Sequence, residues 1–186
     1  SVTELLTCST SGTDLNDGTL SAIYVWTNDT TGSTLGSSAT LQLDSNISSP
    51  DDIITCTVTF TDNNSASISD SANITIGNTP PTFDVEASIS PTNAYTNTEL
   101  TCSATASDAD DGSLTPTYEW TVGANVVGTG DTYTVSSSDT DVGDTIICTA
   151  TATDSNSESI TSTASITVDN TEPVISNIEI TPRTTA

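Results

Sequence analysis

Two short acidic loops carry the residues with the clearest capacity for chemistry. Each loop gathers carboxylate or amide side chains within a few positions and ends in glycine. The loops comprise Asp14, Asn16, Asp17 and Gly18 in one stretch, and Asp108, Asp110, Asp111 and Gly112 in another. Oxygen donors clustered on a tight loop suit Ca²⁺, which binds about six to eight oxygens. Asp and Gly are also favoured in ordinary solvated turns, so a calcium site and a simple turn both stay open.

Four asparagines stand in N-glycosylation sequons, in which a serine or threonine follows two positions later. They are Asn28, Asn46, Asn63 and Asn73. In a chain so rich in Ser and Thr, sequons also arise by chance. Asn73 falls at an outward position of an expected strand. Glycosylation of at least one sequon and an unmodified chain therefore both stay open, as does O-glycosylation of the Ser/Thr-rich faces.

The composition excludes several classes of function. The chain has 25 acidic residues against a single basic one, Arg183, and no histidine, which gives a net charge of −24. Nucleic acids and anionic membrane surfaces need patches of Lys and Arg, so we expect neither as a partner. Without His or Lys, only carboxylates remain for acid–base chemistry, and we expect no enzyme. No apolar run approaches the roughly 18 residues of a membrane helix, so we expect no membrane insertion.

The chain contains two copies of one unit. Three residues of the first copy, Cys8, Trp26 and Cys56, recur as Cys102, Trp120 and Cys148 in the second. The spacing defines a tandem repeat of about 93 residues. From the first cysteine to the tryptophan the two copies have equal length and share further Asp, Gly, Leu and Tyr positions.

Alternation of apolar residues with Ser or Thr predicts short β-strands in both copies. The expected inward residues of the second copy are Leu100, Cys102, Ala104 and Ala106; Tyr118, Trp120 and Val122; Ile146, Cys148, Ala150 and Ala152; and Ala164, Ile166 and Val168. Those of the first copy include Leu6 and Cys8; Tyr24 and Trp26; Ile54, Cys56, Val58 and Phe60; and Ala72, Ile74 and Ile76. Seven strands in each copy predict an all-β fold of two β-sandwiches with thin cores.

The order of cysteines and tryptophans resembles that of immunoglobulin-like (Ig-like) domains. In that family one Cys lies early, a Trp lies on the third strand and a second Cys on the sixth. The approach Asp141-Val-Gly-Asp-Thr-Ile-Ile-Cys148 is similar to the family's Asp-x-Gly motif. The Asn-Thr-x-Pro joints at 78–81 and 170–173 and the acidic, Thr-rich strands look like the tandem Ig-like or PKD-like repeats of microbial surface proteins. The resemblance implies two Ig-like sandwiches and leaves the function open.

The resemblance also implies one disulfide in each copy, which joins Cys8 to Cys56 and Cys102 to Cys148. Each would close a loop of about fifty residues, to which the chain-entropy model assigns about 4 kcal/mol. A zinc site or a reactive thiol is the alternative, but the cysteines are far apart and the chain has no histidine. Oxidised cysteines indicate a secreted protein, located outside the cell or on its surface.

In an Ig-like topology the acidic loops lie at the N-terminal pole of each sandwich. The loop that carries Asp62 in the first copy, and Asp154 in the second, would lie at the same pole. Asn78, in the joint before the second copy, would be close to it. A calcium ion held there would stiffen a tandem array, as in cadherin-like arrangements. Calcium is therefore the one cofactor that the sequence suggests.

The two copies are displaced by one strand. The second has a lead-in, Pro81–Leu100, whose counterpart is missing before Cys8 and appears instead at 174–182. We expect an Ig-like domain without its first strand at 1–79, a complete domain at 80–171 and a spare first strand at 172–186. The apolar residues of the spare strand are Val174, Ile175, Ile178 and Ile180.

This organisation favours a structural subunit or repeat of an extracellular filament or surface stalk. Its partners would be copies of itself, joined head to tail as a covalent tandem array or by donor-strand complementation through residues 173–182. Mutual repulsion between such acidic domains would favour an extended rod. The alternative is the repeat region of a calcium-stiffened cell-surface adhesin that binds glycans or proteins, although aromatic residues make up only 4% of the chain.

Overall fold

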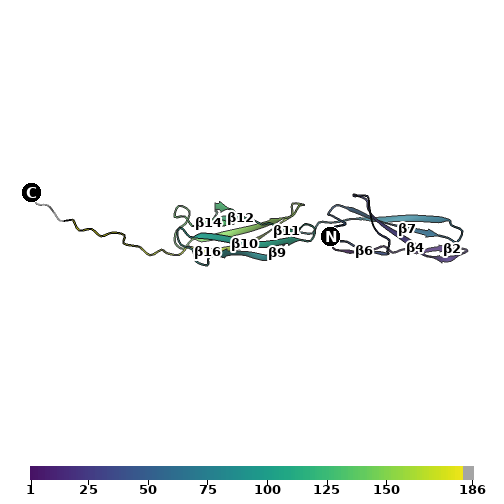
Figure 1. The fold of residues 1–186 in the computed structure, drawn as a ribbon, viewed down its shortest axis with the longest axis horizontal. Coiled ribbons are helices and arrows are strands. Elements are labelled where there is room, and N and C mark those ends of the chain that lie inside the picture. The colour runs from purple at the N-terminus through teal and green to yellow at the C-terminus, as the bar shows by residue number, and fades with distance from the viewer. Residues whose placement is uncertain (182–186) are drawn as a thin grey trace, which may run out of the picture. The chain divides into compact units, whose positions relative to one another are not determined.

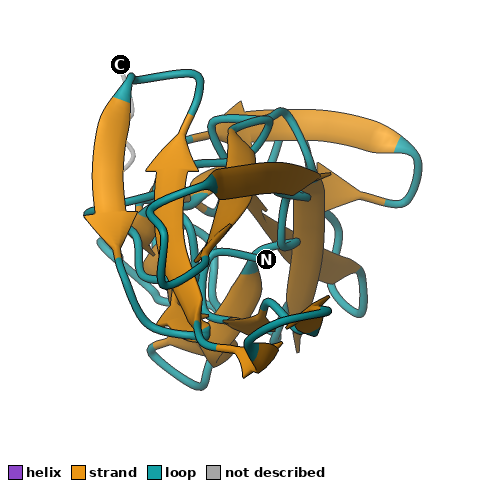
Figure 2. Cartoon of the chain, turned by 90° about the vertical axis from the view of Figure 1, so that its right-hand side faces the viewer, coloured by secondary structure: helices purple, strands orange, loops and turns teal. Residues whose placement is uncertain are grey.

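The computed structural model describes residues 1–181, which form β-strands joined by loops (Figures 1 and 2). The first copy contains β1 (Leu5–Thr7), β2 (Gly12–Asp14), β3 (Gly18–Leu20), β4 (Ala22–Asn28), β5 (Ser33–Gly36), β6 (Thr40–Gln42), β7 (Ile53–Thr61) and β8 (Ser67–Thr75). The second contains β9 (Thr82–Ser90), β10 (Glu99–Asp108), β11 (Gly112–Leu114), β12 (Thr117–Val122), β13 (Asn125–Thr129), β14 (Thr132–Thr134), β15 (Thr145–Thr153) and β16 (Ser159–Thr167). Within the described part of the chain, no helix is long and apolar enough to cross a membrane.

The second copy is an Ig-like sandwich of two four-stranded sheets. One sheet has the order β13-β12-β15-β16. In the other, β10 pairs with β11, with β14 and with β9 (Figure 1). The disulfide between Cys102 on β10 and Cys148 on β15 joins the two sheets. Trp120 is fully buried in the same apolar cluster as both cysteines, as the alternation and the family resemblance predicted.

The first copy repeats this plan with one important difference. Its larger sheet has the order β5-β4-β7-β8, and Trp26 on β4 lies directly opposite Cys56 on β7. The disulfide from Cys56 to Cys8 leads to the other layer, which consists of two separate strand pairs, β1 with β6 and β2 with β3. Both predicted disulfides are therefore confirmed, and so is the all-β, tandem Ig-like fold.

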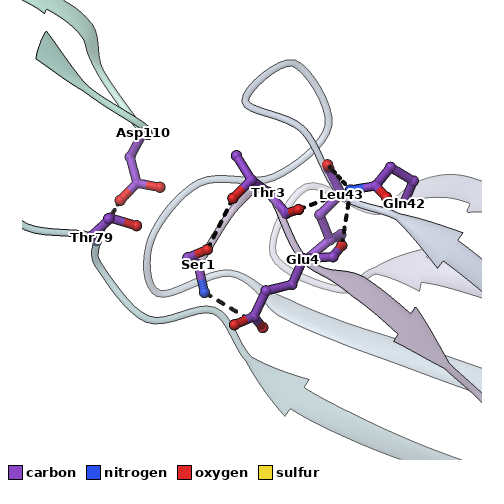
Figure 3. A network of polar contacts seen from close by, with 7 residues as sticks. All are labelled: Ser1, Thr3, Glu4, Gln42, Leu43, Thr79 and Asp110. Carbon is purple, nitrogen blue, oxygen red and sulfur yellow. Dashed lines mark hydrogen bonds and ion pairs between the residues drawn. The ribbon is translucent and has the colours of Figure 1, made fainter.

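The chain before β1 is held by the strand that pairs with it. Val2 is fully buried in the first core. The side-chain amide of Gln42 donates to the carbonyl oxygen of Thr3 at 2.9 Å, and the Leu43 N–H donates to the carbonyl of Glu4 at 2.9 Å (Figure 3). Backbone and side-chain bonds thus fix this segment where it enters the sheet.

Not all inward positions of the first copy are covered. Every residue of β8 is exposed, including Ala72 and Ile74, which the alternation placed inside. In the second copy β16 alternates between exposed and covered residues. The physical reason is that β9 pairs with β10 and packs its apolar residues on the second core, whereas no described strand occupies the corresponding place in the first. Ala72 and Ile74 lie opposite the buried Cys56 and Ile54 and line the hollow over the first core, so they face inward as predicted but are not covered.

The strand that carries the first cysteine of each copy also differs between the two copies. β10 runs unbroken for 10 residues between neighbours on both sides. Its counterpart in the first copy is interrupted at residues 8–11, which separate β1 from β2. A strand edge without a neighbour presents unpaired N–H and C=O groups, so this edge is available for pairing.

One close contact distinguishes the packing of the two cores. A Cβ placed on Gly12 would lie only 2.6 Å from Cδ1 of the Phe60 ring. The matching positions of the second copy, Ala106 and Ala152, are both small and buried. Phe60 therefore fills the volume that the missing side chain of Gly12 leaves free.

We predict that Gly12→Ala lowers the free energy of unfolding of the first sandwich by about 1–3 kcal/mol, because the added methyl overpacks the site against Phe60. Gly77→Ala is the control, because a Cβ there meets nothing within 4 Å. Urea unfolding followed by tryptophan fluorescence measures both variants. Equal stability of the two would contradict the packing described.

Candidate functional site

An open groove lies over the first core, where a first strand would pack. It has a volume of about 310 Å³. Its lining comes from β1 and the residues after it, from the core beneath and from β8, and comprises Leu6, Thr7, Cys8, Ser9, Trp26, Ile54, Cys56, Ala72, Asn73 and Ile74. Two neighbouring hollows of about 140 and 200 Å³ lie further along β8, and their lining includes Val58 and Phe60 of β7 and Ile68 of β8. The first disulfide and part of the apolar core are thus reachable from outside.

In the second copy β9 covers the corresponding region. Ala87 and Ile89 are half-buried and pack on the second core. The backbone N–H of Ala87 donates to the hydroxyl of Ser162 on β16 at 2.9 Å, and Ser162 is itself 7% exposed. Cys102 is 1% exposed, whereas Cys8 is only half-buried. The first strand therefore supplies the cover that the first copy lacks.

The described part of the segment expected to be a spare first strand, residues 172–181, is exposed. Residues 169–181 form no strand, and the rest of the predicted segment, from 182, lies outside the described residues. Four of its large apolar side chains lie in water, namely Val174 (86%), Ile175 (78%), Ile178 (79%) and Ile180 (90%). The chain thus carries both an uncovered apolar groove and an uncovered apolar segment.

The two acidic loops fold in the same way. In each, one carboxylate oxygen accepts two backbone N–H groups of its own loop, which is the Asx-type turn that Asp favours. Asp14 Oδ1 accepts from Asn16 at 2.7 Å and from Asp17 at 3.0 Å. Asp108 Oδ1 accepts from Asp110 at 2.6 Å and from Asp111 at 3.1 Å.

The last carboxylate of each loop ties it to the neighbouring turn. Asp17 accepts from the backbone N–H and the side-chain amide of Asn63, at 3.1 and 2.7 Å. Asp111 accepts from the backbone N–H and the hydroxyl of Ser155, both at 2.8 Å. Asp62 itself accepts N–H groups of its own turn, from Asn64 and Ala66, both at 2.8 Å. These residues hold the loops together and have protein donors for partners.

A denser set of contacts surrounds the second loop. Asn78 and Thr79, which lead into β9, reach it from the preceding chain. The Asn78 amide donates to Asp154 Oδ2 at 2.9 Å. The backbone N–H of Thr79 donates to Asp110 Oδ2 at 2.6 Å, as Figure 3 shows. The hydrogen bond from Asn78 is the main reason that the pKa of Asp154 lies below its ordinary value.

Several oxygens of this second set have no hydrogen-bond partner although they are buried. They are Asn78 Oδ1, Thr79 Oγ1, Asp108 Oδ2 and Asp110 Oδ1. Within residues 1–181 no three acidic or cysteine side chains form a group placed to hold a metal ion. Only two of the four oxygens belong to acidic residues, and the other two belong to an amide and a hydroxyl. The sequence singled out Asn78, Asp108 and Asp110 but missed Thr79, whose only sequence signal is its place next to Asn78.

The four sequons lie in different environments. Asn46, Asn63 and Asn73 are exposed. Asn28 is fully buried, and its amide donates to Asp52 Oδ2 at 2.7 Å and to the carbonyl of Ile47 at 3.3 Å. Its Oδ1 accepts the N–H groups of the two residues at 30 and 31. Glycosylation stays a prediction, which the structure favours at the three exposed asparagines over Asn28.

Comparisons with known proteins give a distant structural likeness. No family model matches the chain, and no curated protein matches it. A solved structure of the three N-terminal domains of the bacteriophage RB49 Highly Immunogenic Outer Capsid protein (Hoc) is similar at 17% identity with a TM-score of 0.36. The alignment covers 80% of this chain and 48% of that one, so the chain spans about half the length of its structural neighbour. A likeness at this level carries no functional argument, and the fold assignment rests on the strands and disulfides described above.

We predict that Asn28→Ala lowers the free energy of unfolding by about 2–3 kcal/mol, because the buried carboxylate of Asp52 loses a hydrogen-bond donor. Asp52 is 7% exposed, so water does not readily replace the lost amide. Asn46→Ala is the matched control at an exposed sequon and should change stability by less than about 0.5 kcal/mol. Chemical denaturation of unglycosylated protein checks both. A neutral Asn28→Ala would show that the buried amide is dispensable.

Proposed function

We propose that the chain is a structural unit of an extracellular filament or surface stalk, and that units join head to tail by donating a first strand. The observation that carries the proposal is the contrast between the two copies. The same disulfide-centred core is covered by β9 in the second copy and open along β8 in the first. The occupant we assign to the open groove is segment 173–181 of another copy of this chain.

The donated segment has the sequence pattern of the strand that it would replace. Residues 83–91 of β9 and the following turn read Phe-Asp-Val-Glu-Ala-Ser-Ile-Ser-Pro, and residues 174–182 read Val-Ile-Ser-Asn-Ile-Glu-Ile-Thr-Pro. In this alignment Val174, Ile178 and Ile180 stand at the places of Phe83, Ala87 and Ile89. All three of those β9 residues are half-buried. The larger side chains of the donor suit a groove that is now open to solvent.

Contacts of β9 define the register of the donated strand. Ser88 Oγ lies 3.1 Å from Ser103 Oγ, and Asp84 Oδ1 accepts from Ser107 Oγ at 2.8 Å, so the two strands run antiparallel. The residues of the first copy that match Ser103 and Ser107 are Ser9 and Thr13. The donor would therefore place Glu179 opposite Ser9 and Ile175 opposite Thr13.

Strand donation satisfies two physical needs together. The donor's backbone pairs with the free edge at residues 8–11, and its apolar side chains leave water for the groove. Electrostatic repulsion between units opposes assembly, because each carries a net charge of −24. Salt shortens the range of that repulsion, so assembly should strengthen as ionic strength rises. Two structural disulfides suit a location outside the cell.

We predict that Thr13→Cys combined with Ile175→Cys gives a ladder of disulfide-linked oligomers under mild oxidation, because the register places these positions opposite each other. The measurement is a non-reducing denaturing gel. Thr13→Cys combined with Glu179→Cys is the matched control, since four residues of slip along a strand separate the thiols by about 13 Å. Equal cross-linking of the two pairs, or cross-linking within single chains, would contradict donation between copies in this register.

We further predict that a chain shortened after Asn170 stays monomeric under conditions in which the full chain assembles. Light scattering or electron microscopy measures the difference. Adding a synthetic peptide of residues 171–186 should raise the thermal stability of the shortened chain, because it fills the groove. Filaments formed by the shortened chain would refute strand donation. Filament material that denatures to one very large chain, and not to a species near 19 kDa, would indicate a covalent array instead.

A further inference from the structure

We infer that the second acidic loop, together with the two residues that lead into β9, binds one calcium ion. The inference is independent of strand donation, because it concerns different residues. The donors are the four buried oxygens without partners, Asn78 Oδ1, Thr79 Oγ1, Asp108 Oδ2 and Asp110 Oδ1. All belong to one compact unit of the chain, which comprises Ser1–Val85, Thr105–Pro116 and Thr151–Thr161.

Hydrogen bonds and chain adjacency hold these four residues next to one another. The N–H of Asp110 donates to Asp108 Oδ1, and Asp110 Oδ2 accepts the N–H of Thr79. Asn78 is the neighbour of Thr79 and is fixed by its bond to Asp154. Each of these residues uses one polar group in a hydrogen bond that positions it, and its remaining side-chain oxygen has no partner. This is the arrangement expected of ligands that are positioned by the protein for an ion.

Burial makes the unpartnered oxygens costly without a cation. Asp108 is 7% exposed, and a buried carboxylate oxygen without a partner loses its hydration without compensation. Elsewhere in the described chain buried polar groups such as Asn28 and Asp52 satisfy each other. Four buried oxygens without partners at one place are an exception to that pattern and offer their lone pairs to a bound ion.

A cation bound by these oxygens would come from solution, because residues 1–181 contain no Lys or Arg. The sequence holds a single Lys or Arg, at position 183, which lies outside the described residues. The N-terminal ammonium lies 3.7 Å from the Glu4 carboxylate. Asn78 must present its oxygen, since its Nδ2 faces the carboxylate of Asp154, which only accepts. Two carboxylates, one amide and one hydroxyl form an all-oxygen set with a charge of −2, which suits Ca²⁺ completed by water.

The first copy offers a matched control within the same molecule. Its loop has the same turn, in which Asp14 accepts from Asn16 and Asp17. It differs in two respects. Asn16 stands where the second loop has Asp110, and Asp14 is only half-buried. The first loop therefore lacks one of the two carboxylates and the burial of the other.

The test is calorimetric titration of the full chain with CaCl₂ after treatment with a chelator, at constant ionic strength. We expect one site per chain, with a dissociation constant in the range of extracellular calcium modules, about 10⁻⁴ to 10⁻³ M. Ca²⁺ should also raise the melting temperature in a saturable way, because it binds the folded state. Mg²⁺ at the same ionic strength should do so less, because it resists losing its water.

Variants separate a specific site from general screening of the charge. Asp108→Asn and Asp110→Asn should each weaken calcium binding at least about tenfold, whereas Asp14→Asn should leave the affinity within about twofold. Asn78→Ala, which removes a neutral ligand, keeps the test decisive if a carboxylate variant does not fold. Absence of a saturable site, or equal loss in Asp14→Asn and Asp108→Asn, would overturn the inference. Equal stabilisation by Ca²⁺ and Mg²⁺ would also overturn it, because that result indicates screening.

Discussion

Cover of a thin apolar core by a first strand is the interaction that distinguishes the two sandwiches. Each core centres on a disulfide and a tryptophan and adds aliphatic side chains with Phe60 in the first copy and Tyr133 in the second, because most other strand positions are Ser or Thr. In such a core one uncovered face is a large fraction of the whole. The second copy covers that face with β9, and the result is a disulfide with both cysteines almost fully buried. In the first copy the equivalent face is a groove, and its strands are interrupted along the open edge.

The acidity of the chain shapes the polar contacts in a similar way. With almost no cationic side chains, carboxylates are satisfied by N–H and O–H donors of nearby turns and side chains. Asp14, Asp17, Asp62 and Asp111 all show this arrangement. Asp108 and Asp110 share it for one oxygen each and leave the other without a partner. That difference between otherwise matching loops is the physical basis of the proposed calcium site.

Much of the fold follows from local sequence patterns. Alternation placed Trp120, Ile146 and Ala150 inside, and each is fully buried. It also placed Ala72 and Ile74 on the inward side, where they remain exposed, because alternation reports which side of a strand a residue occupies and not whether anything lies on that side. The candidate sites were predictable only where they depend on residues within one loop. The turn at Asp108 was readable from its residues, but the part played by Thr79 was not, since it depends on a backbone contact with a residue distant in sequence.

The sequence by itself determined the repeat, the strand pattern and, through their family resemblance, the cysteine pairs. These properties depend on local sequence or on composition, so they can be predicted without knowledge of packing. Only the tertiary structure decided that the first core is open, that Asn28 is a buried structural amide, and that four unpartnered oxygens gather beside the second loop. Each of these depends on which distant segments come together and which do not, and burial and hydrogen-bond satisfaction are properties of that assembly.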